Sequence, residues 1–311
     1  MQISRAIGQD ALSIGGSRAF GNTQSVTHGA MRFVTPAINP SARRGVMTVS
    51  KAAAAVVALG VFGSAAQGAS CPHPGVLGTA RTMVIDAAKY PRVGTKSFPQ
   101  TLPLDDHEVV LTFDDGPAAT TPKILNALAD ECVKATFFLV GRPASEMPAL
   151  VGRIAAEGHT VAHHTWSHQH MTKLSHADAL DEINRGIAAD EDVLRGKGYA
   201  ISTTKFFRFP YFESTPALLD DLESRGIVVW GADLWASDWN LMTPEVQLKL
   251  ITDRLEAAGK GIILFHDPRP QTVAMMPAFL SYLRENNYRV VHVVPPPAEH
   301  PAVAGGSHAT R

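Results

Sequence analysis

The chain alternates short apolar runs with longer segments whose apolar residues recur every three or four positions. The runs predict buried strands, and the longer segments predict amphipathic helices. Strands are expected at residues 108–113, 135–140, 159–164, 205–209, 227–233, 262–267 and 288–294. Helices are expected at residues 121–132, 146–158, 175–198, 215–226, 243–261 and 272–287. Three of these helices begin with Thr-Pro, at Thr121, Thr215 and Thr243, which is a helix-start signal.

Repetition of strand and then helix requires parallel strands, because each helix returns the chain to the same edge of the sheet. About seven such units predict an α/β fold of the incomplete (β/α) barrel type, similar to a TIM barrel. In such a barrel the functional side chains lie at the C-terminal ends of the strands. Polar residues that follow the predicted strands are therefore the candidates for chemistry.

The N-terminal part of the chain has a different pattern. Arg43, Arg44 and Lys51 precede an apolar run over 52–62, and small residues follow up to Ser70. This layout predicts a secretory signal peptide cleaved near residues 66–69. An uncleaved membrane anchor is the alternative, but the apolar run is short for a membrane span. We expect the protein to be exported, to the periplasm or outside the cell.

The same patterns divide the chain into four parts. Residues 1–69 are expected to be an N-terminal extension with the signal peptide, and 70–104 a lead-in segment of uncertain order. Residues 105–294 hold the strand and helix repeats and form the predicted catalytic domain. Residues 295–311 are rich in proline, glycine and alanine and are expected to be a disordered tail.

Composition and charge exclude some functions. Hydrophobic residues make up 45% of the 311 residues and charged residues 18%, as in ordinary globular proteins. The net charge is −1 and no basic run occurs, so we expect no nucleic acid partner. The only cysteines, Cys71 and Cys132, allow one disulfide but exclude a cysteine-based zinc site.

Chemically active side chains follow five of the predicted strands. Asp114 and Asp115 end the first strand in "LTFDDGP", although Asp-Gly is also common in turns. The others are His164 and His168 after the third strand, Arg208 and Tyr211 after the fourth, Asp233, Asp238 and Trp239 after the fifth, and His266 after the sixth. Because parallel strands end at one edge, these side chains are expected to converge.

The two histidines have the spacing of metal ligands. His164 and His168 are four residues apart, which would place both imidazoles on one face of a helical turn. Such a pair alone also fits structural or surface histidines. One carboxylate of the acidic pair would complete three ligands, which suits Zn²⁺ with an open position for water. The other carboxylate would then be free to take a proton from that water.

Two further side chains fit this chemistry. Arg208 stands among Phe206, Phe207 and Phe209, and near a carboxylate it would keep that base charged. An exposed charge is the alternative interpretation of Arg208. His266 ends an apolar strand and is either a core histidine or a general acid for the leaving group.

Five segments together resemble a known family. "TFDDGP", "HTWSH", "RFPY", "DLWASDW" and "LFH" occur in the order of the five motifs of the polysaccharide deacetylases, the NodB-homology group or carbohydrate esterase family 4. The resemblance covers about residues 107–294. It implies a distorted (β/α) barrel and metal-dependent removal of acetyl groups. The implied substrates are N-acetylglucosamine-containing glycans, such as peptidoglycan, chitin oligomers or an exported polymer.

The resemblance also implies the roles of the catalytic and metal-binding residues. Asp114 resembles the catalytic base, and Arg208 the residue that orients and charges it. Asp115, His164 and His168 resemble the metal ligands.

The remaining roles follow from the later motifs. The backbone N–H of Tyr211 would stabilise the oxyanion, and His266 resembles the general acid. Leu264 resembles a leucine that lines the substrate groove, and Trp239 its aromatic wall.

The chain departs from the family pattern at several positions. Phe212 stands where glycine is usual, which would reshape the groove. Four residues separate Asp233 from Asp238, which is more than usual, and we expect Asp233 to be the carboxylate that tethers His266. His163 stands where asparagine is common. It and His170 are expected to be surface histidines, with an outer-shell role as the alternative.

Other functions remain compatible with the residues. An O-acetyl esterase acting on xylan would use the same base and metal. A carbohydrate-binding relative without activity would keep the barrel but not require a complete set of catalytic residues. A purely structural zinc site is disfavoured because only three protein ligands are present.

Overall fold

The computed structural model describes residues 74–199 and 205–297. All of them belong to the second of two compact units, Ser64–Arg311. The predicted signal peptide, Cys71 and most of the predicted tail lie outside the described residues. Within the described ranges, no helix is both long enough and apolar enough to cross a membrane.

The repeated strand and helix pattern forms the predicted parallel sheet. The strands expected from the sequence are β3 (Glu108–Asp114), β4 (Thr136–Leu139), β5 (Thr160–His163), β6 (Phe206–Phe207), β7 (Val228–Trp230), β9 (Gly261–His266) and β10 (Arg289–Val294). Hydrogen bonding runs from β9 through β3, β4, β5 and β6 to β7, and β10 pairs with the start of β3. All of these pairings are parallel.

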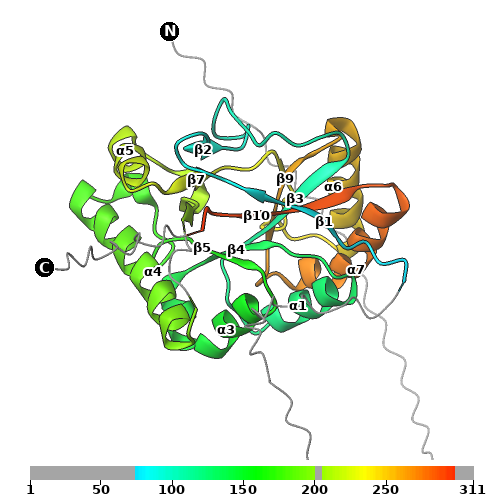
Figure 1. The fold of residues 1–311 in the computed structure, drawn as a ribbon, viewed down its shortest axis with the longest axis horizontal. Helices are drawn as coiled ribbons and strands as arrows, with labels where there is room; N and C mark the ends of the chain where they lie inside the picture. The colour runs from blue at the N-terminus through cyan, green and yellow to red at the C-terminus, as the bar shows by residue number, and fades with distance from the viewer. Residues whose placement is uncertain (1–73, 200–204, 298–311) are drawn as a thin grey trace, which may run out of the picture. The chain divides into compact units, whose positions relative to one another are not determined.

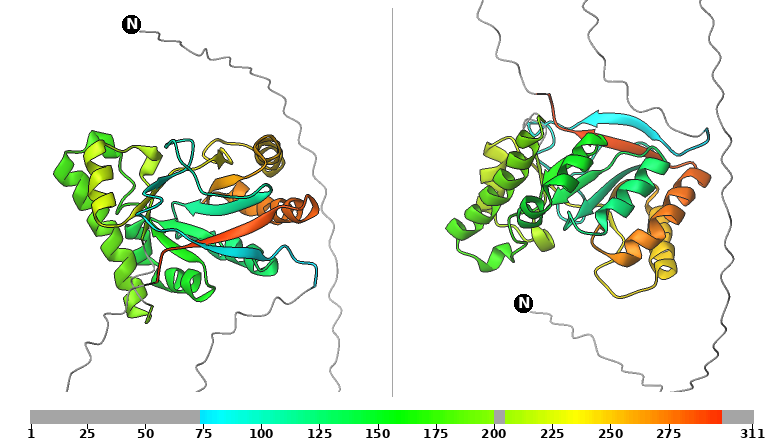
Figure 2. Two further views of the ribbon diagram at one scale, coloured as in Figure 1. Left: turned by 45° about the horizontal axis from the view of Figure 1, so that its top comes forward. Right: turned by 90° about the horizontal axis from the view of Figure 1, so that it is seen from below.

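Three strands were not predicted. They are β1 (Thr79–Val84), β2 (Arg92–Val93) and β8 (Leu234–Trp235). β1 extends the sheet beyond β10, as Figure 2 shows, while β2 pairs with β7 and β8 with β9. Among the described strands, no pairing joins β2 to β8, so the barrel is not closed. The distorted, incomplete (β/α) barrel is thereby confirmed.

Part of the predicted lead-in is therefore ordered. β1 is fixed to β3 by a bidentate ion pair, in which Arg81 donates from Nε at 2.8 Å and from Nη2 at 2.7 Å to the carboxylate of Glu108. β1 has no clear hydrophobic pattern because most of its side chains are not buried.

Helices surround the strands in Figure 1. They are α1 (Thr121–Asp130), α2 (Gly141–Glu146), α3 (Pro148–Ala156), α4 (His176–Gly196), α5 (Pro216–Ser224), α6 (Pro244–Ala258) and α7 (Pro270–Glu285). The predicted helix over 146–158 corresponds to α3, whereas α2 was not predicted, and Met147 alone separates the two helices before the proline of α3. A residue before proline is disfavoured in the helical conformation, which explains the break.

Two of the three Thr-Pro starts act as predicted. The hydroxyls of Thr215 and Thr243 accept the backbone N–H of Leu218 and Val246, which caps α5 and α6. Thr121 differs, because it lies inside α1 and Thr120 precedes the helix.

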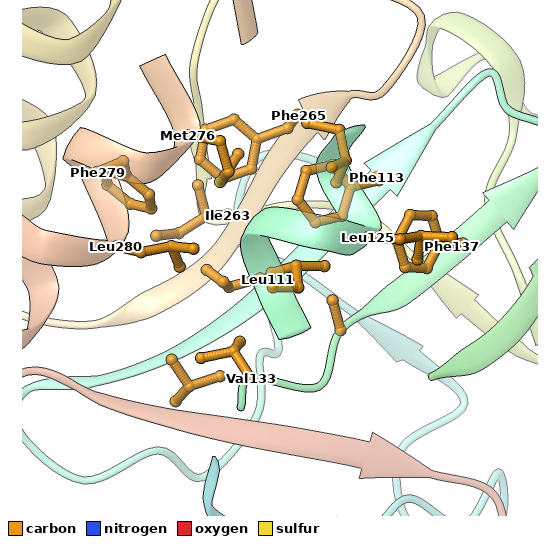
Figure 3. Close-up of a cluster of buried hydrophobic side chains, with 14 of the residues drawn as sticks. Leu111, Phe113, Leu125, Val133, Phe137, Ile263, Phe265, Met276, Phe279 and Leu280 are labelled. Atoms are coloured by element: carbon orange, nitrogen blue, oxygen red, sulfur yellow. The ribbon is translucent and has the colours of Figure 1, made fainter. Parts of the chain in front are cut away.

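The side chains of β3 alternate between two hydrophobic clusters. Leu111 and Phe113 pack outward against α1 and α7, and the ring of Phe113 lies 5.1 Å from Phe137 and 5.5 Å from Phe265 (Figure 3). Val110 belongs to the inner cluster. Because a strand has a period of two, Asp114 shares the inner face with Val110. The alternation thus delivers the carboxylate of Asp114 to the barrel interior.

Candidate active site

The sheet register brings the predicted residues to one edge. Asp114 is the last residue of β3 and pairs with His266, the last residue of β9. His164 directly follows β5, and Arg208 directly follows β6. The predicted convergence of these residues at the C-terminal ends of the strands is confirmed.

Three side chains form a potential metal site. The ligand atoms of Asp115, His164 and His168 all lie within 4.8 Å of one another, and within the described ranges no other such group occurs. Oδ1 of Asp115 lies 3.5 Å from Nε2 of His164 and 3.1 Å from Nε2 of His168. The prediction that the two histidines share a helical turn is wrong, because residues 164–168 form a non-helical loop. Positive φ angles at Thr165 (66°) and His168 (58°) bend this loop.

The donor set fits a divalent cation. Nδ1 of His164 lies 2.7 Å from the backbone oxygen of Arg208. Because a carbonyl only accepts, Nδ1 carries the proton, and Nε2 presents its lone pair to the other ligands. Oδ1 of Asp115 is buried and has no hydrogen bond within the described residues. Lone pairs therefore converge on one point, as a cation requires.

The electrostatics of Asp115 agree with this arrangement. Burial by itself would raise the pKa of the Asp115 carboxyl, but hydrogen bonds from His164 and His168 and their positive charge, which these rings carry when protonated, outweigh burial and lower the pKa well below its usual range. Asp115 is therefore a carboxylate at neutral pH.

Asp114 has a separate partner. Nη1 of Arg208 donates to Oδ1 of Asp114 at 2.6 Å, and both side chains are almost fully buried. Arg208 also donates to Oγ1 of Thr112 at 2.9 Å and to the backbone oxygen of Gly231 at 2.7 Å, and it stacks over the ring of Phe138. These contacts hold the guanidinium in one orientation. The prediction that Arg208 serves Asp114 is consistent with this geometry, and the exposed-charge alternative is wrong.

His266 is held by Asp238. Its Nδ1 lies 2.7 Å from Oδ1 of Asp238, and its backbone N–H donates to Oδ2 at 2.7 Å. The hydroxyl of Thr272 donates to the same Oδ2 at 2.7 Å. Burial lowers the pKa of His266, but the bond to Asp238 and its charge outweigh burial and raise the pKa to about 9. His266 is thus protonated at neutral pH.

The prediction that Asp233 tethers His266 is wrong. The carboxylate of Asp233 accepts from the backbone N–H of Thr95 at 2.8 Å, from the hydroxyl of Thr101 at 2.7 Å and from the backbone N–H of Ile262 at 2.9 Å. The unpredicted strand β8 explains the difference. It runs along β9 from the level of Ile263 to that of Leu264, so Asp233 lies near the start of β9 and Asp238 near its end.

A cavity of about 520 Å³ opens over these groups. Its lining consists of Asp114, Asp115, His164, His168, Phe209, Tyr211, Phe212, Trp235, Trp239, Leu264, His266 and Arg269. Tyr211, Trp239 and Leu264, which were predicted to contact substrate, are thus brought together with the catalytic candidates. A cavity of about 890 Å³ elsewhere contains none of the predicted site residues.

Comparison with known proteins decides the family. A family model described as polysaccharide deacetylase matches residues 102–230. The chitin deacetylase of Colletotrichum lindemuthianum is 31% identical over 197 residues, which are 60% of this chain and 77% of that protein. The chain belongs to the polysaccharide deacetylase family.

Other relatives of this chain have names that include peptidoglycan. A peptidoglycan-N-acetylglucosamine deacetylase of Bacillus cereus is 34% identical over 189 residues, which are 57% of this chain and 66% of that protein. The structure of a peptidoglycan deacetylase of Bdellovibrio bacteriovorus matches with a TM-score of 0.61 and 30% identity, over 70% of this chain and 59% of that one. Matches to the curated peptidoglycan relatives cover only 38% to 66% of their length.

His163 is not the surface residue that we expected, whereas His170 is partly exposed but has partners that we did not predict. His163 is fully buried, and its Nδ1 lies 2.7 Å from Oδ2 of Asp190, which is also buried. Burial raises the pKa of Asp190 to about 6, against the opposing effect of His163. His170 lies 2.9 Å from the carboxylate of Glu213 and stacks on Tyr211. Neither partner was found from the sequence, because Asp190 and Glu213 lie 27 and 43 residues away from their histidines.

Proposed function

We propose that this deacetylase hydrolyses the N-acetyl group of N-acetylglucosamine units in a polysaccharide or oligosaccharide outside the cytoplasm. The observation that carries the proposal is the pairing of two different acid–base groups at one cavity. Asp114 is paired with Arg208, His266 is paired with Asp238, and the trio of Asp115, His164 and His168 lines the same cavity.

The metal is proposed to be Zn²⁺, because two imidazoles and one carboxylate are the donor set of many catalytic zinc sites. When bound, a zinc ion supplies Lewis-acid polarisation of a carbonyl group. Asp115, His164 and His168 would hold it.

Asp114 is proposed as the general base. Its Oδ1 is occupied by Arg208, and its Oδ2 lies 3.8 Å from Nε2 of His164, so the free oxygen faces the trio. There Oδ2 would take a proton from a water molecule, and the resulting hydroxide would attack the acetyl carbonyl carbon. The backbone N–H of Tyr211, in a turn at the cavity wall, is the proposed donor to the oxyanion.

His266 is proposed as the general acid. Asp238 occupies its Nδ1 and keeps the ring protonated, so Nε2 carries a proton for the leaving group. When the C–N bond breaks, that proton goes to the sugar nitrogen, and acetate and a free amine are released. The exposed ring of Trp239 stands edge-on to His266, 6.0 Å between ring centres, and Leu264 lies on the same wall. These two side chains would hold the sugar.

Peptidoglycan is the substrate named for several relatives and chitin for another, and both polymers contain N-acetylglucosamine. Export to the periplasm or outside the cell fits such substrates and the signal peptide predicted over 1–69, which lies outside the described residues.

The proposal is tested by acetate release. The purified protein would be incubated with peptidoglycan, N-acetylglucosamine oligomers and O-acetylated xylan, each with and without a chelator. We expect release from an N-acetylated glycan that stops with the chelator and returns with Zn²⁺. Release from xylan alone would identify an O-acetyl esterase instead, and glycan binding without any release would identify a binding protein.

A further inference from the structure

The turn Pro210–Glu213 has an unusual backbone. The N–H of Glu213 donates to the oxygen of Pro210 at 3.0 Å, which closes a four-residue turn. Both central residues have positive φ angles, 55° at Tyr211 and 57° at Phe212. Turns with two positive φ angles are dominated by glycine, asparagine and aspartate, because larger side chains are strained there. This turn instead carries two aromatic residues.

Side chains of the neighbouring loop hold the turn in place. The carboxylate of Glu213 contacts Nδ1 of His170 at 2.9 Å and accepts from the hydroxyl of Thr172 at 2.8 Å. The ring of His170 stacks on that of Tyr211, with 4.0 Å between centres and 10° between planes. A strained conformation persists only where its surroundings fix it, and these contacts do so.

Core packing does not compensate for the strain at Phe212. Within the described ranges, its ring joins none of the three buried hydrophobic clusters, and the side chain is only partly buried. The ring instead lines the active-site cavity and lies 6.2 Å from that of Trp235. Strained residues of this kind are concentrated at functional sites.

A series of ring contacts leads along the cavity wall away from His266. Trp239 contacts His266, Trp235 contacts Trp239 at 5.8 Å, and Phe212 contacts Trp235. The ring of Phe212 is therefore removed from the general-acid candidate by two tryptophans, where a neighbouring sugar unit would lie.

We propose that Phe212 is a specificity-determining residue whose ring, beside Trp235, stacks on the sugar unit next to the one that carries the acetyl group. The proposal rests on the proposed function of the same site. The site then favours glycan chains over single sugars. The strained turn is retained because it places this ring at the groove.

Three substitutions separate the ring from the strain. Phe212→Gly removes both, Phe212→Leu removes the aromatic face but keeps a bulky residue at positive φ, and Phe212→Tyr keeps both. Binding of N-acetylglucosamine oligomers, from dimer to hexamer, would be followed by tryptophan fluorescence. Thermal unfolding would be measured on the same samples.

For wild type and Phe212→Tyr, we expect affinity to rise with oligomer length. Phe212→Gly and Phe212→Leu should lose roughly threefold to tenfold in affinity for the long oligomers. Phe212→Gly should also melt at a higher temperature than wild type.

Unchanged length dependence in Phe212→Gly would overturn the proposal. So would a lower melting temperature for Phe212→Gly, which would show that the ring supports the fold. Wild-type behaviour of Phe212→Leu would exclude aromatic stacking. Length-dependent binding by a wild-type protein that releases no acetate would contradict only the proposed function. If the wild-type protein released acetate and Phe212→Gly bound the oligomers with the same length dependence as wild type, only the role of Phe212 would be contradicted.

Discussion

Asp238 holds His266 through both of its carboxylate oxygens, one 2.7 Å from the ring Nδ1 and the other 2.7 Å from the backbone nitrogen. The two contacts fix the position and the orientation of the imidazole together. They also leave Nε2 as the only ring nitrogen available to a substrate, which suits a general acid.

Replacing Asp238 by asparagine should shift the alkaline limit of activity. An acid works only while protonated, so the wild-type kcat/KM should fall as the pH rises through about 9. Without the Asp238 charge, burial dominates and lowers the pKa of His266. In Asp238→Asn the alkaline limit of kcat/KM should therefore move to lower pH, with at least about a tenfold loss of kcat/KM at pH 8. The measurement is kcat/KM as a function of pH.

Asp233→Asn is the matched control. Asp233 connects Thr95, Thr101 and Ile262 and has no contact with His266. The substitution Asp233→Asn should lower the melting temperature and leave the pH dependence of kcat/KM unchanged. If Asp233→Asn moved the alkaline limit and Asp238→Asn did not, the assignment of Asp238 would be wrong.

The sequence predicted this edge of the barrel well but not this contact. Apolar runs predicted all seven main strands, and the barrel rule placed Asp114 at the C-terminal end of the first of them. β8 has only two residues and directly follows the strand predicted over 227–233, so the sequence shows no separate signal for it. Without β8, the fourth motif was placed by the end of the predicted strand, and Asp233 was chosen over Asp238.

The candidate metal ligands were predicted for a partly incorrect reason. His164 and His168 do converge on Asp115, but through a loop with positive φ angles rather than through a helical turn. Spacing along the sequence cannot distinguish the two, since a tight loop and a helical turn both bring residues four apart together. Asp190 and Glu213 also escaped detection, because contacts across many residues depend on the tertiary structure.

Substitution of a ligand should remove the metal without unfolding the protein. We expect Asp115→Asn and His164→Ala to lose bound Zn²⁺ and acetate release together, because three ligands become two. Metal content by atomic emission and circular dichroism of the same samples would check this. His170→Ala is the control, since His170 lies outside the trio and should retain metal. Wild-type metal content in both ligand variants would contradict the assignment.

The pair of Arg208 and Asp114 should make Arg208 important for stability. Arg208→Met leaves a buried carboxylate without its cation, which should reduce the free energy of unfolding by about 3–5 kcal/mol. Urea denaturation would measure the loss. Lys249→Met is the control, because the pair of Lys249 and Asp253 is exposed to solvent and should contribute little to stability. Equal effects of the two substitutions would show that the buried pair is not a stabilising contact.

The division of the acidic pair between two tasks is tested most directly by Asp114→Asn. Asparagine keeps the shape and an oxygen for Arg208 but cannot take a proton. The measurement is kcat for acetate release together with bound metal in the same preparation. We predict a loss of ~10²–10⁴-fold in kcat with wild-type metal content. A kcat close to that of the wild type, or a loss of metal equal to that of Asp115→Asn, would contradict the assignment of Asp114 as the base.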